Sequence, residues 1–220
     1  MRVACRPRKR AFAVILTVLL APGVARADRG ALTVDLGTGA TSLALRPPYA
    51  ESGRTGWSLA LSVSFGLRYA LTNQLELTTG GFYELPVHVS HAGTSVPTVD
   101  SGTFTGTLEY ELTRFGALAG IRYVSGLVVR VSIGVELGWS HQSNSALLLR
   151  DTASLGAPDY GLGLPDVGVD SLVLQPLVGL EWAFADHWSA SVVLRLTALL
   201  GPEPAFGISA GLTICYGWFP

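Results

Sequence analysis

The chain has 220 residues, of which 49% are hydrophobic and only 14% charged, and its 15 Lys and Arg nearly balance its 16 Asp and Glu. This charged fraction is well below the quarter or so of a typical soluble domain, and the balanced charge excludes the basic footprint of a nucleic-acid-binding protein. Two cysteines are too few for a disulfide framework or a metal cluster. No apolar run reaches the about 18 residues that a transmembrane helix needs.

The N-terminus has the three parts of a secretory signal peptide. Basic residues between Arg2 and Arg10 precede an apolar run at 11–20, and Ala25-Arg26-Ala27 supplies the small residues that signal peptidase requires. We therefore predict a signal peptide at 1–27 and a single domain at 28–220. Cleavage would leave an acidic chain with one cysteine, Cys215.

Long stretches of the remaining chain alternate between apolar and polar residues, which is typical of strands with one apolar face. In 127–140 every odd residue from Leu127 to Trp139 is apolar, whereas the even positions are small or polar. Eight such segments are expected, at 31–46, 55–70, 74–88, 101–124, 127–142, 171–185, 188–200 and 205–219. They are about twice the usual strand length of about 5–6 residues. The pattern predicts an all-β fold, an antiparallel up-and-down transmembrane β-barrel of eight strands. A soluble sandwich or lipocalin-like barrel is the alternative.

The segment 101–124 changes its apolar phase near Thr113-Arg114, from even-numbered to odd-numbered positions. A turn at that point would give nine strands, whereas a β-bulge would shift the phase within one strand. Bacterial barrels have even strand numbers, with short turns on one side and long loops on the other. Only the bulge places the short links 71–73, 125–126 and 186–187 on one side and the links 47–54, 89–100, 143–170 and 201–204 on the other. We therefore expect one bulged strand, and a bulge or local irregularity at Pro176. The alternation of 31–46 is interrupted at 37–40, and the alternative for this segment is a partly disordered leader.

Aromatic residues collect at the two ends of the predicted strands, as expected at membrane interfaces. The predicted girdles comprise Trp57, Tyr69, Tyr83, Tyr123, Trp139, Trp182, Trp188 and Trp218.

The face opposite the apolar one carries ionisable residues. By alternation these are Arg68, Glu76, Glu84, Arg122, Arg130, Glu136, Glu181 and Arg195, and Glu109 and Glu111 join them if their even-numbered apolar neighbours face outward. An eight-stranded barrel is just wide enough for side chains to fill, and buried charges need partners. We expect a salt-bridged lumen in which Arg130 and Glu136 pair with neighbouring strands. A narrow ion or solute path is the alternative.

Taken together, the signal peptide, the strand pattern and the last strand resemble the superfamily of small eight-stranded outer-membrane β-barrels. The last strand, with Ala210, Leu212, Ile214, Tyr216 and Trp218 on one face, is similar to the C-terminal signal read by the barrel-insertion machinery. It departs from the usual terminal aromatic residue because Pro220 follows Phe219. The resemblance implies a monomer in the cell outer membrane, with outer-membrane lipids and the insertion machinery as partners. It does not specify an activity, because one fold carries many functions.

One motif suggests catalysis. His141-Gln142-Ser143-Asn144 is similar to the His-x-Ser-Asn motif of outer-membrane lipid A deacylases, in which the His activates the Ser nucleophile. Alternation places both His141 and Ser143 on the lipid-facing side, but spacing assigns no acidic partner, and Asp151 and Asp159 are the candidates. His88 and His91, without nearby carboxylates, do not predict a metal site. No metal or cofactor is predicted.

The leading interpretation is a non-enzymatic outer-membrane barrel with a structural or interaction role, whose long outer loops 89–100 and 143–170 meet an extracellular partner that the residues do not identify. A small-solute channel and a lipid A deacylase-like enzyme are the alternatives.

Overall fold

A computed structural model describes residues 29–45, 48, 56–97, 103–126, 129–151 and 161–218. The predicted signal peptide lies outside these residues. The strands are β1 (Leu32–Leu45), β2 (Gly56–Ala70), β3 (Leu75–Pro97), β4 (Thr103–Ser125), β5 (Val129–Asp151), β6 (Gly161–Gly163), β7 (Val167–Ala185), β8 (Trp188–Leu200) and β9 (Ala205–Trp218). In the described part of the chain, no helix is long and apolar enough to cross a membrane.

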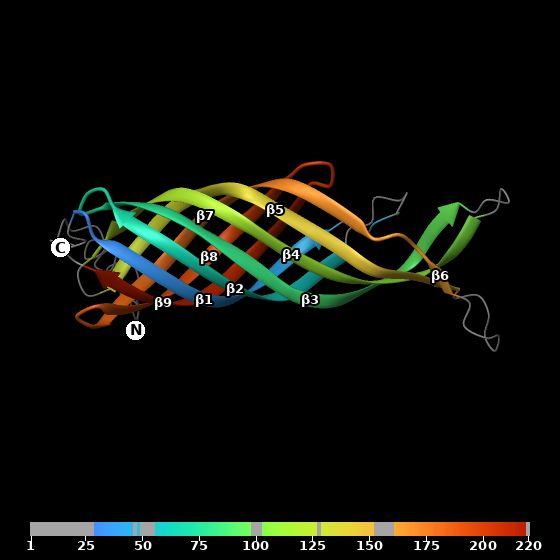
Figure 1. The fold of residues 1–220 in the computed structure, drawn as a ribbon, viewed down its shortest axis with the longest axis horizontal. Coiled ribbons are helices and arrows are strands. Elements are labelled where there is room, and N and C mark those ends of the chain that lie inside the picture. The colour runs from blue at the N-terminus through green and yellow to red at the C-terminus, as the bar shows by residue number, and fades with distance from the viewer. Residues whose placement is uncertain are drawn as a thin grey trace, which may run out of the picture.

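Eight long strands form a closed antiparallel barrel (Figure 1). Each strand pairs with the next, and β1 closes the ring by pairing with both β2 and β9. Leu32, for example, lies opposite both Tyr69 and Trp218. The short β6 pairs with Leu148–Arg150 of β5 at one end of the barrel. The predicted fold class is therefore confirmed, with β6 as an addition that the sequence did not indicate.

Over most of the barrel the apolar side chains face outward and the polar ones inward. In β2, Leu61 and Phe65 are 60% and 65% exposed, whereas Arg68 is 4% exposed. A soluble protein would bury such apolar side chains in a core, so this outer wall suits the hydrocarbon of a bilayer. On β5 the exposed apolar run from Val129 to Trp139 covers about 33 Å of strand at about 3.3 Å per residue. A tilt of about 40° reduces this to about 25 Å, the height of the apolar band in membrane barrels.

The expected bulge at Thr113-Arg114 is wrong. The described part of this segment is one continuous strand, β4 (Thr103–Ser125), and its even-numbered residues from Phe104 to Val124 face inward along the whole length. What changes at Arg114 is the environment. Toward the β6 end the interior is apolar and the outer wall polar, and toward the other end this arrangement is reversed. The phase shift in the sequence therefore marks the point where the barrel leaves the bilayer.

The irregularities lie in the two neighbours of β4. The β3–β4 register shifts between Glu84 and Val87 and again between Ala92 and Thr94. The β4–β5 register shifts where β5 contains Ala146, which has a φ of 53°. Both β3 and β5 extend beyond the predicted 74–88 and 127–142, so much of the predicted loops 89–100 and 143–170 is strand. We call the projecting parts of β3 (Val87–Val96), β4 (Thr103–Leu112) and β5 (Ser145–Arg150), together with β6, the outer sheet.

Inside the barrel, an apolar cluster fills the end that carries the outer sheet. Its buried members are Leu43, Leu45, Val96, Leu108, Tyr110, Leu112, Leu147, Leu149, Val173, Leu199 and Ala205. Leu108 and Leu149 are 0% exposed. This end of the barrel is therefore packed like a soluble domain.

Pro176 interrupts a ladder, as expected for a residue without a backbone donor. The β7–β8 pairing runs to Leu174 and resumes at Leu177 in the same register, so the irregularity is a gap and not a bulge. The Gln175 side chain bridges the gap by donating to Thr197 Oγ1 over 2.9 Å. In contrast, the stretch 37–40 pairs regularly with both β2 and β9.

Candidate functional site

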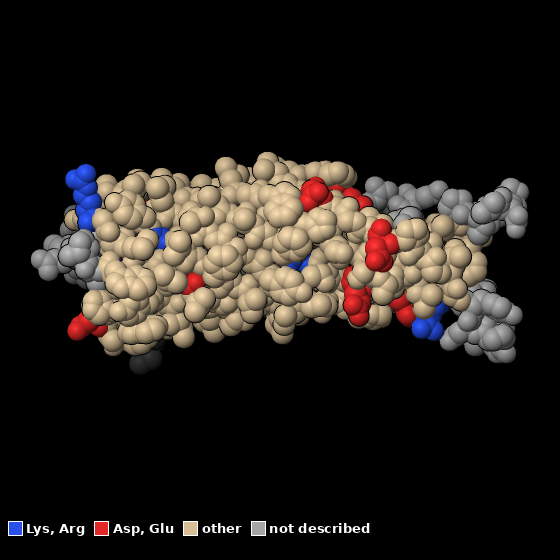
Figure 2. Space-filling view, viewed as in Figure 1, with Lys and Arg blue, Asp and Glu red and all other residues tan. Residues whose placement is uncertain are grey.

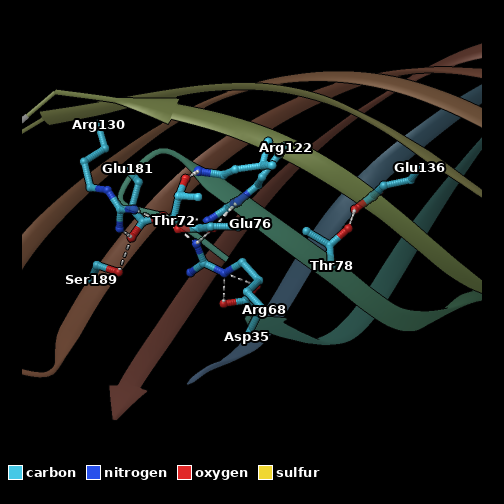
Figure 3. A network of polar contacts seen from close by, with 11 residues as sticks. Asp35, Arg68, Thr72, Glu76, Thr78, Arg122, Arg130, Glu136, Glu181 and Ser189 are labelled. Atoms are coloured by element: carbon cyan, nitrogen blue, oxygen red, sulfur yellow. Dashed lines mark hydrogen bonds and ion pairs between the residues drawn. The ribbon is translucent and has the colours of Figure 1, made fainter. Parts of the chain in front are cut away.

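The end of the lumen opposite the outer sheet contains a connected cluster of charges (Figure 3). Glu181 on β7 accepts hydrogen bonds from Arg68 over 2.8 Å, from Arg122 over 3.3 Å and from Arg130 over 3.2 Å. Ser189 Oγ also donates to Glu181, over 2.9 Å. One carboxylate thus bridges strands from opposite walls of the barrel.

A second carboxylate in the same cluster repeats this role. Glu76 on β3 accepts from Arg122 Nε over 2.6 Å and from Arg130 Nη2 over 2.8 Å. Arg68, which is 4% exposed, also pairs with Asp35 on β1 at 2.6 Å. Such charge-assisted bonds satisfy carboxylates that would otherwise be costly to bury.

Two further ion pairs lie farther along the lumen. Arg195 Nε on β8 donates to Glu136 Oε2 on β5 over 3.3 Å, and Thr78 Oγ1 donates to the other oxygen of Glu136 over 3.4 Å. Arg114 and Glu84, opposite each other on β4 and β3, form a bidentate pair. The Arg114 guanidinium also lies 5.2 Å from the centre of the Phe82 ring.

Among the described residues, the inner wall carries equal numbers of positive and negative side chains. They are Arg68, Arg114, Arg122, Arg130 and Arg195, with Asp35, Glu76, Glu84, Glu136 and Glu181. The structure places all eight predicted lumen residues among them. Sequence reasoning missed Asp35, because its strand alternates weakly, and Arg114, because it was assigned to a bulge. Arg130 pairs with Glu181 on the adjacent β7 and with Glu76 on β3, two strands away. Glu136 pairs with Arg195 on β8 and not with a charge on an adjacent strand.

Two polar cavities flank the charged cluster. One of about 110 Å³ is lined by Arg68, Arg114, Arg195 and several Ser and Thr hydroxyls, and one of about 200 Å³ lies at the turn end beside Arg130 and His187. Arg114 Nη1 and Gln175 Oε1 have no hydrogen-bond partner among the described residues. Both cavities are large enough for water molecules, and these two atoms could provide polar partners for them. The apolar cluster lies at the other end of the lumen.

The predicted girdle residues all lie exposed on the outer wall. Their exposed fractions run from 39% to 69%, for Trp57, Tyr69, Tyr83, Tyr123, Trp139, Trp182, Trp188 and Trp218. Tyr69 and Trp218 share one end of the barrel through their common partner Leu32, whereas Trp139 packs edge-on against Phe115 at the other end. Two aromatic belts are what the two interfaces of a membrane favour.

Glu109 and Glu111 do not face the lumen, which corrects that conditional expectation. Their even-numbered neighbours Leu108 and Tyr110 point inward, so both carboxylates face outward, and Glu109 pairs with Arg150 at 2.9 Å. Figure 2 shows acidic side chains gathered toward the end of the barrel that carries the outer sheet, while the middle of the visible face is almost free of charge.

His91 on the outer sheet lies at the contact between β3 and β2. Its ring stacks on Tyr110, with the ring centres 6.0 Å apart, and contacts Gly56. Burial lowers the pKa of His91, and it raises the pKa of Tyr110 to about 12. His88 is exposed on the same strand.

The motif residues His141 and Ser143 lie at the outer aromatic belt. His141 Nδ1 lies 3.0 Å from Asp170 Oδ1, and Trp139 Nε1 donates to the same oxygen over 3.1 Å. Asp170 on β7 lies directly opposite His141 on β5. The sequence did not identify this partner, because the two residues are 29 positions apart and only the pairing of β5 with β7 brings them together. The earlier candidate Asp159 lies outside the described residues.

Comparison with known proteins finds solved structures that are similar to this fold. No family model and no curated protein sequence matches the chain. The crystal structure of Ail from Yersinia pestis, in complex with the heparin analogue sucrose octasulfate, aligns with a TM-score of 0.50 and 12% identity, covering 86% of this chain and 99% of that one. Neisserial surface protein A aligns with a TM-score of 0.47 and 14% identity, covering 84% and 98%. OprG from Pseudomonas aeruginosa aligns with a TM-score of 0.48 and 8% identity, covering 87% and 97%.

At these identities the likeness is one of fold. The closed ring, the apolar outer wall and the Ail structure together define the class: this chain has the fold of the small eight-stranded outer-membrane β-barrels.

Proposed function

We propose that the protein resides in the outer membrane as a sealed barrel that acts through its outer sheet and not by transport. The observation that carries this proposal is the filling of the lumen. Ion pairs cross it at the turn end, and the apolar cluster around Leu108 and Leu149 fills the other end. A solute would have to displace both.

The orientation follows from the lengths of the connections. The tight connections between β2 and β3 and between β7 and β8 lie at one end of the barrel, and the outer sheet projects from the other. Short periplasmic turns and longer outer segments are the rule in bacterial barrels. The outer sheet then faces the exterior. Signal peptidase removes residues 1–27, and the insertion machinery reads the C-terminal signal in β9. The protein then enters the membrane as a monomer.

The charge of the outward-facing side chains beyond the apolar band indicates the kind of extracellular partner. The outward side chains beyond the apolar band include the exposed Glu111, Asp166 and Asp170, whereas Arg150 is paired with Glu109. An acidic surface attracts a basic partner and repels a polyanion. The sulfated ligand in the Ail structure is therefore a poor guide to this chain, and we expect a protein or peptide partner with a basic surface.

Conductance tests the sealed lumen. The purified barrel, folded in detergent and inserted into planar bilayers, should give no stable single-channel steps. Steps of reproducible size would favour the channel alternative and overturn the proposal. Heat-modifiable migration on a denaturing gel, before and after boiling, verifies that the barrel under test is folded.

Charge reversal tests the outer sheet. The double variant Glu111→Lys/Asp166→Lys should lose salt-sensitive binding to an immobilised Lys- and Arg-rich peptide. Asp186→Lys, which reverses an exposed charge at the turn end, is the matched control and should bind like the native protein. Equal binding by the double variant and the control would contradict an interaction role for this surface.

A further inference from the structure

The cavity at the turn end of the lumen is larger than a single bridging water requires. Its volume is about 200 Å³, and on the same measure one water molecule needs about 10–15 Å³. Its wall extends from the buried Glu181 to Asp186 and His187, which are exposed in the connection between β7 and β8. The cavity therefore has room for a small ligand, and its lining reaches the exposed end of the barrel.

Two arginines in the wall of this cavity have N–H groups without acceptors. Arg68 Nη2 and Arg130 Nε are buried and have no hydrogen-bond partner among the described residues. Arg68 uses its other nitrogens for Asp35 and Glu181. Arg130 uses Nη1 and Nη2 for Glu181 and Glu76. Figure 3 shows the two arginines directed toward Glu181 from different strands. Because a buried donor without an acceptor is costly, the wall favours a ligand that supplies oxygen atoms.

The carboxylates of the same cluster do not offer an equivalent site to a cation. Both oxygens of Glu181 accept hydrogen bonds from arginines, and Oε1 also accepts from Ser189. The two oxygens of Glu76 accept from Arg122 and Arg130. In the described part of the chain, the groups of this cluster that are left without a partner are therefore donors. Guanidinium N–H groups bind the oxygens of carboxylates and phosphates.

We propose that this cavity binds a small oxyanion, which accepts hydrogen bonds from Arg68 Nη2 and Arg130 Nε. The three arginines of the cluster balance its three carboxylates. Directed hydrogen bonds, and not an excess of positive charge, therefore hold the anion, and its affinity is modest. The site lies at the opposite end of the barrel from the outer sheet and is independent of the partner proposed there.

Anion-dependent stability tests the site. The folded barrel in a non-ionic detergent is titrated separately with inorganic phosphate and with acetate, and its urea midpoint is compared with that in chloride at matched ionic strength. A ligand that binds only the folded state raises the midpoint. Because phosphate also stabilises proteins through exclusion from their surface, direct binding is measured in parallel by calorimetry. Binding of either anion supports the proposal and distinguishes a tetrahedral from a planar ligand. Binding of neither would overturn it and leave water as the occupant.

Three variants locate the site. Ala183→Leu enlarges an exposed side chain in the cavity wall and alters no ion pair, so the barrel should fold and lose anion binding. Arg130→Lys removes Nε–H but keeps a positive charge beside Glu76 and Glu181, and should raise the dissociation constant at least about tenfold. Arg195→Lys, the matched control, makes the same change at a lumen arginine outside the described lining of this cavity, and should bind like the native protein. Native binding by a heat-modifiable Ala183→Leu barrel, or an equal loss in Arg195→Lys, would contradict the site.

Discussion

Arg114 lies directly opposite Glu84 across β4 and β3, and the two side chains form a bidentate pair immediately inside the point where the interior becomes apolar. Two residues farther along β4, the inward side chain is the buried Leu112. The pair therefore marks the boundary between the polar lumen and the apolar cluster. Both side chains are almost fully buried, at 2% and 4% exposure.

Breaking this pair should be costly. In Arg114→Met, Glu84 keeps a buried carboxylate without its partner, and we expect the unfolding free energy to fall by about 3–5 kcal/mol. The double variant Glu84→Gln/Arg114→Met removes the orphaned charge and should recover much of the loss. Urea titrations in detergent micelles, followed by tryptophan fluorescence, measure both. Equal losses in the single and double variants would show that the charge pair is not the cause.

The two carboxylates Glu181 and Glu136 should differ in their contributions. Glu181 accepts from three arginines and Ser189, whereas Glu136 pairs with Arg195, whose side chain is 26% exposed. Glu181→Gln should lower the unfolding free energy by about 3–5 kcal/mol, and Glu136→Gln by less than half as much, because partial exposure screens its pair. The same urea titration compares them. A larger effect at Glu136 would contradict the bridging role of Glu181.

Gly138 is needed for the close approach of β4 and β5. A Cβ at this position would lie 1.9 Å from the Ala117 carbonyl oxygen, which is backbone and cannot move aside cheaply. We expect Gly138→Val to abolish formation of the heat-modifiable barrel. Gly163→Ala in β6, where a Cβ would meet nothing within 4 Å, is the control and should fold normally. A folded Gly138→Val barrel would contradict the packing at this position.

The outer sheet should lose stability in acid through His91. Burial lowers the pKa of His91, so below about pH 6.5 the unfolded chain binds a proton that the folded protein excludes. The stabilisation is complete above that pH and is lost as the pH falls toward the lowered pKa. His91→Phe, which keeps a ring against Tyr110 and Gly56, should show a weaker decline in the unfolding midpoint between pH 7 and pH 5. Parallel declines in the variant and the native protein would exclude His91 as the source.

Period-two alternation in the sequence was enough to predict the architecture. A strand in a bilayer must expose apolar side chains on one face and enclose polar ones on the other. The direction in which Phe65 or Arg68 points can therefore be predicted from its residue type and its place in the alternation, even when its partners are unknown. The strand bounds of β1, β2, β8 and β9 were predicted to within one residue at each end. The number of strands followed from loop lengths, although the bulge invoked for β4 does not exist.

Only the tertiary structure decided where the lipid ends and which residues meet. From the sequence, the phase change at Arg114 was explained by a turn or by a bulge within the strand. The structure shows neither in β4, because the strand continues through Arg114 with its even-numbered residues inward and the register shifts lie in its neighbours. Partners such as Glu136 with Arg195, or His141 with Asp170, are set by barrel closure and strand register, which bring distant positions to the same height. Alternation determines the face of the strand on which a side chain lies. Which two side chains contact each other depends on the register between strands, and that register is fixed only in the closed sheet.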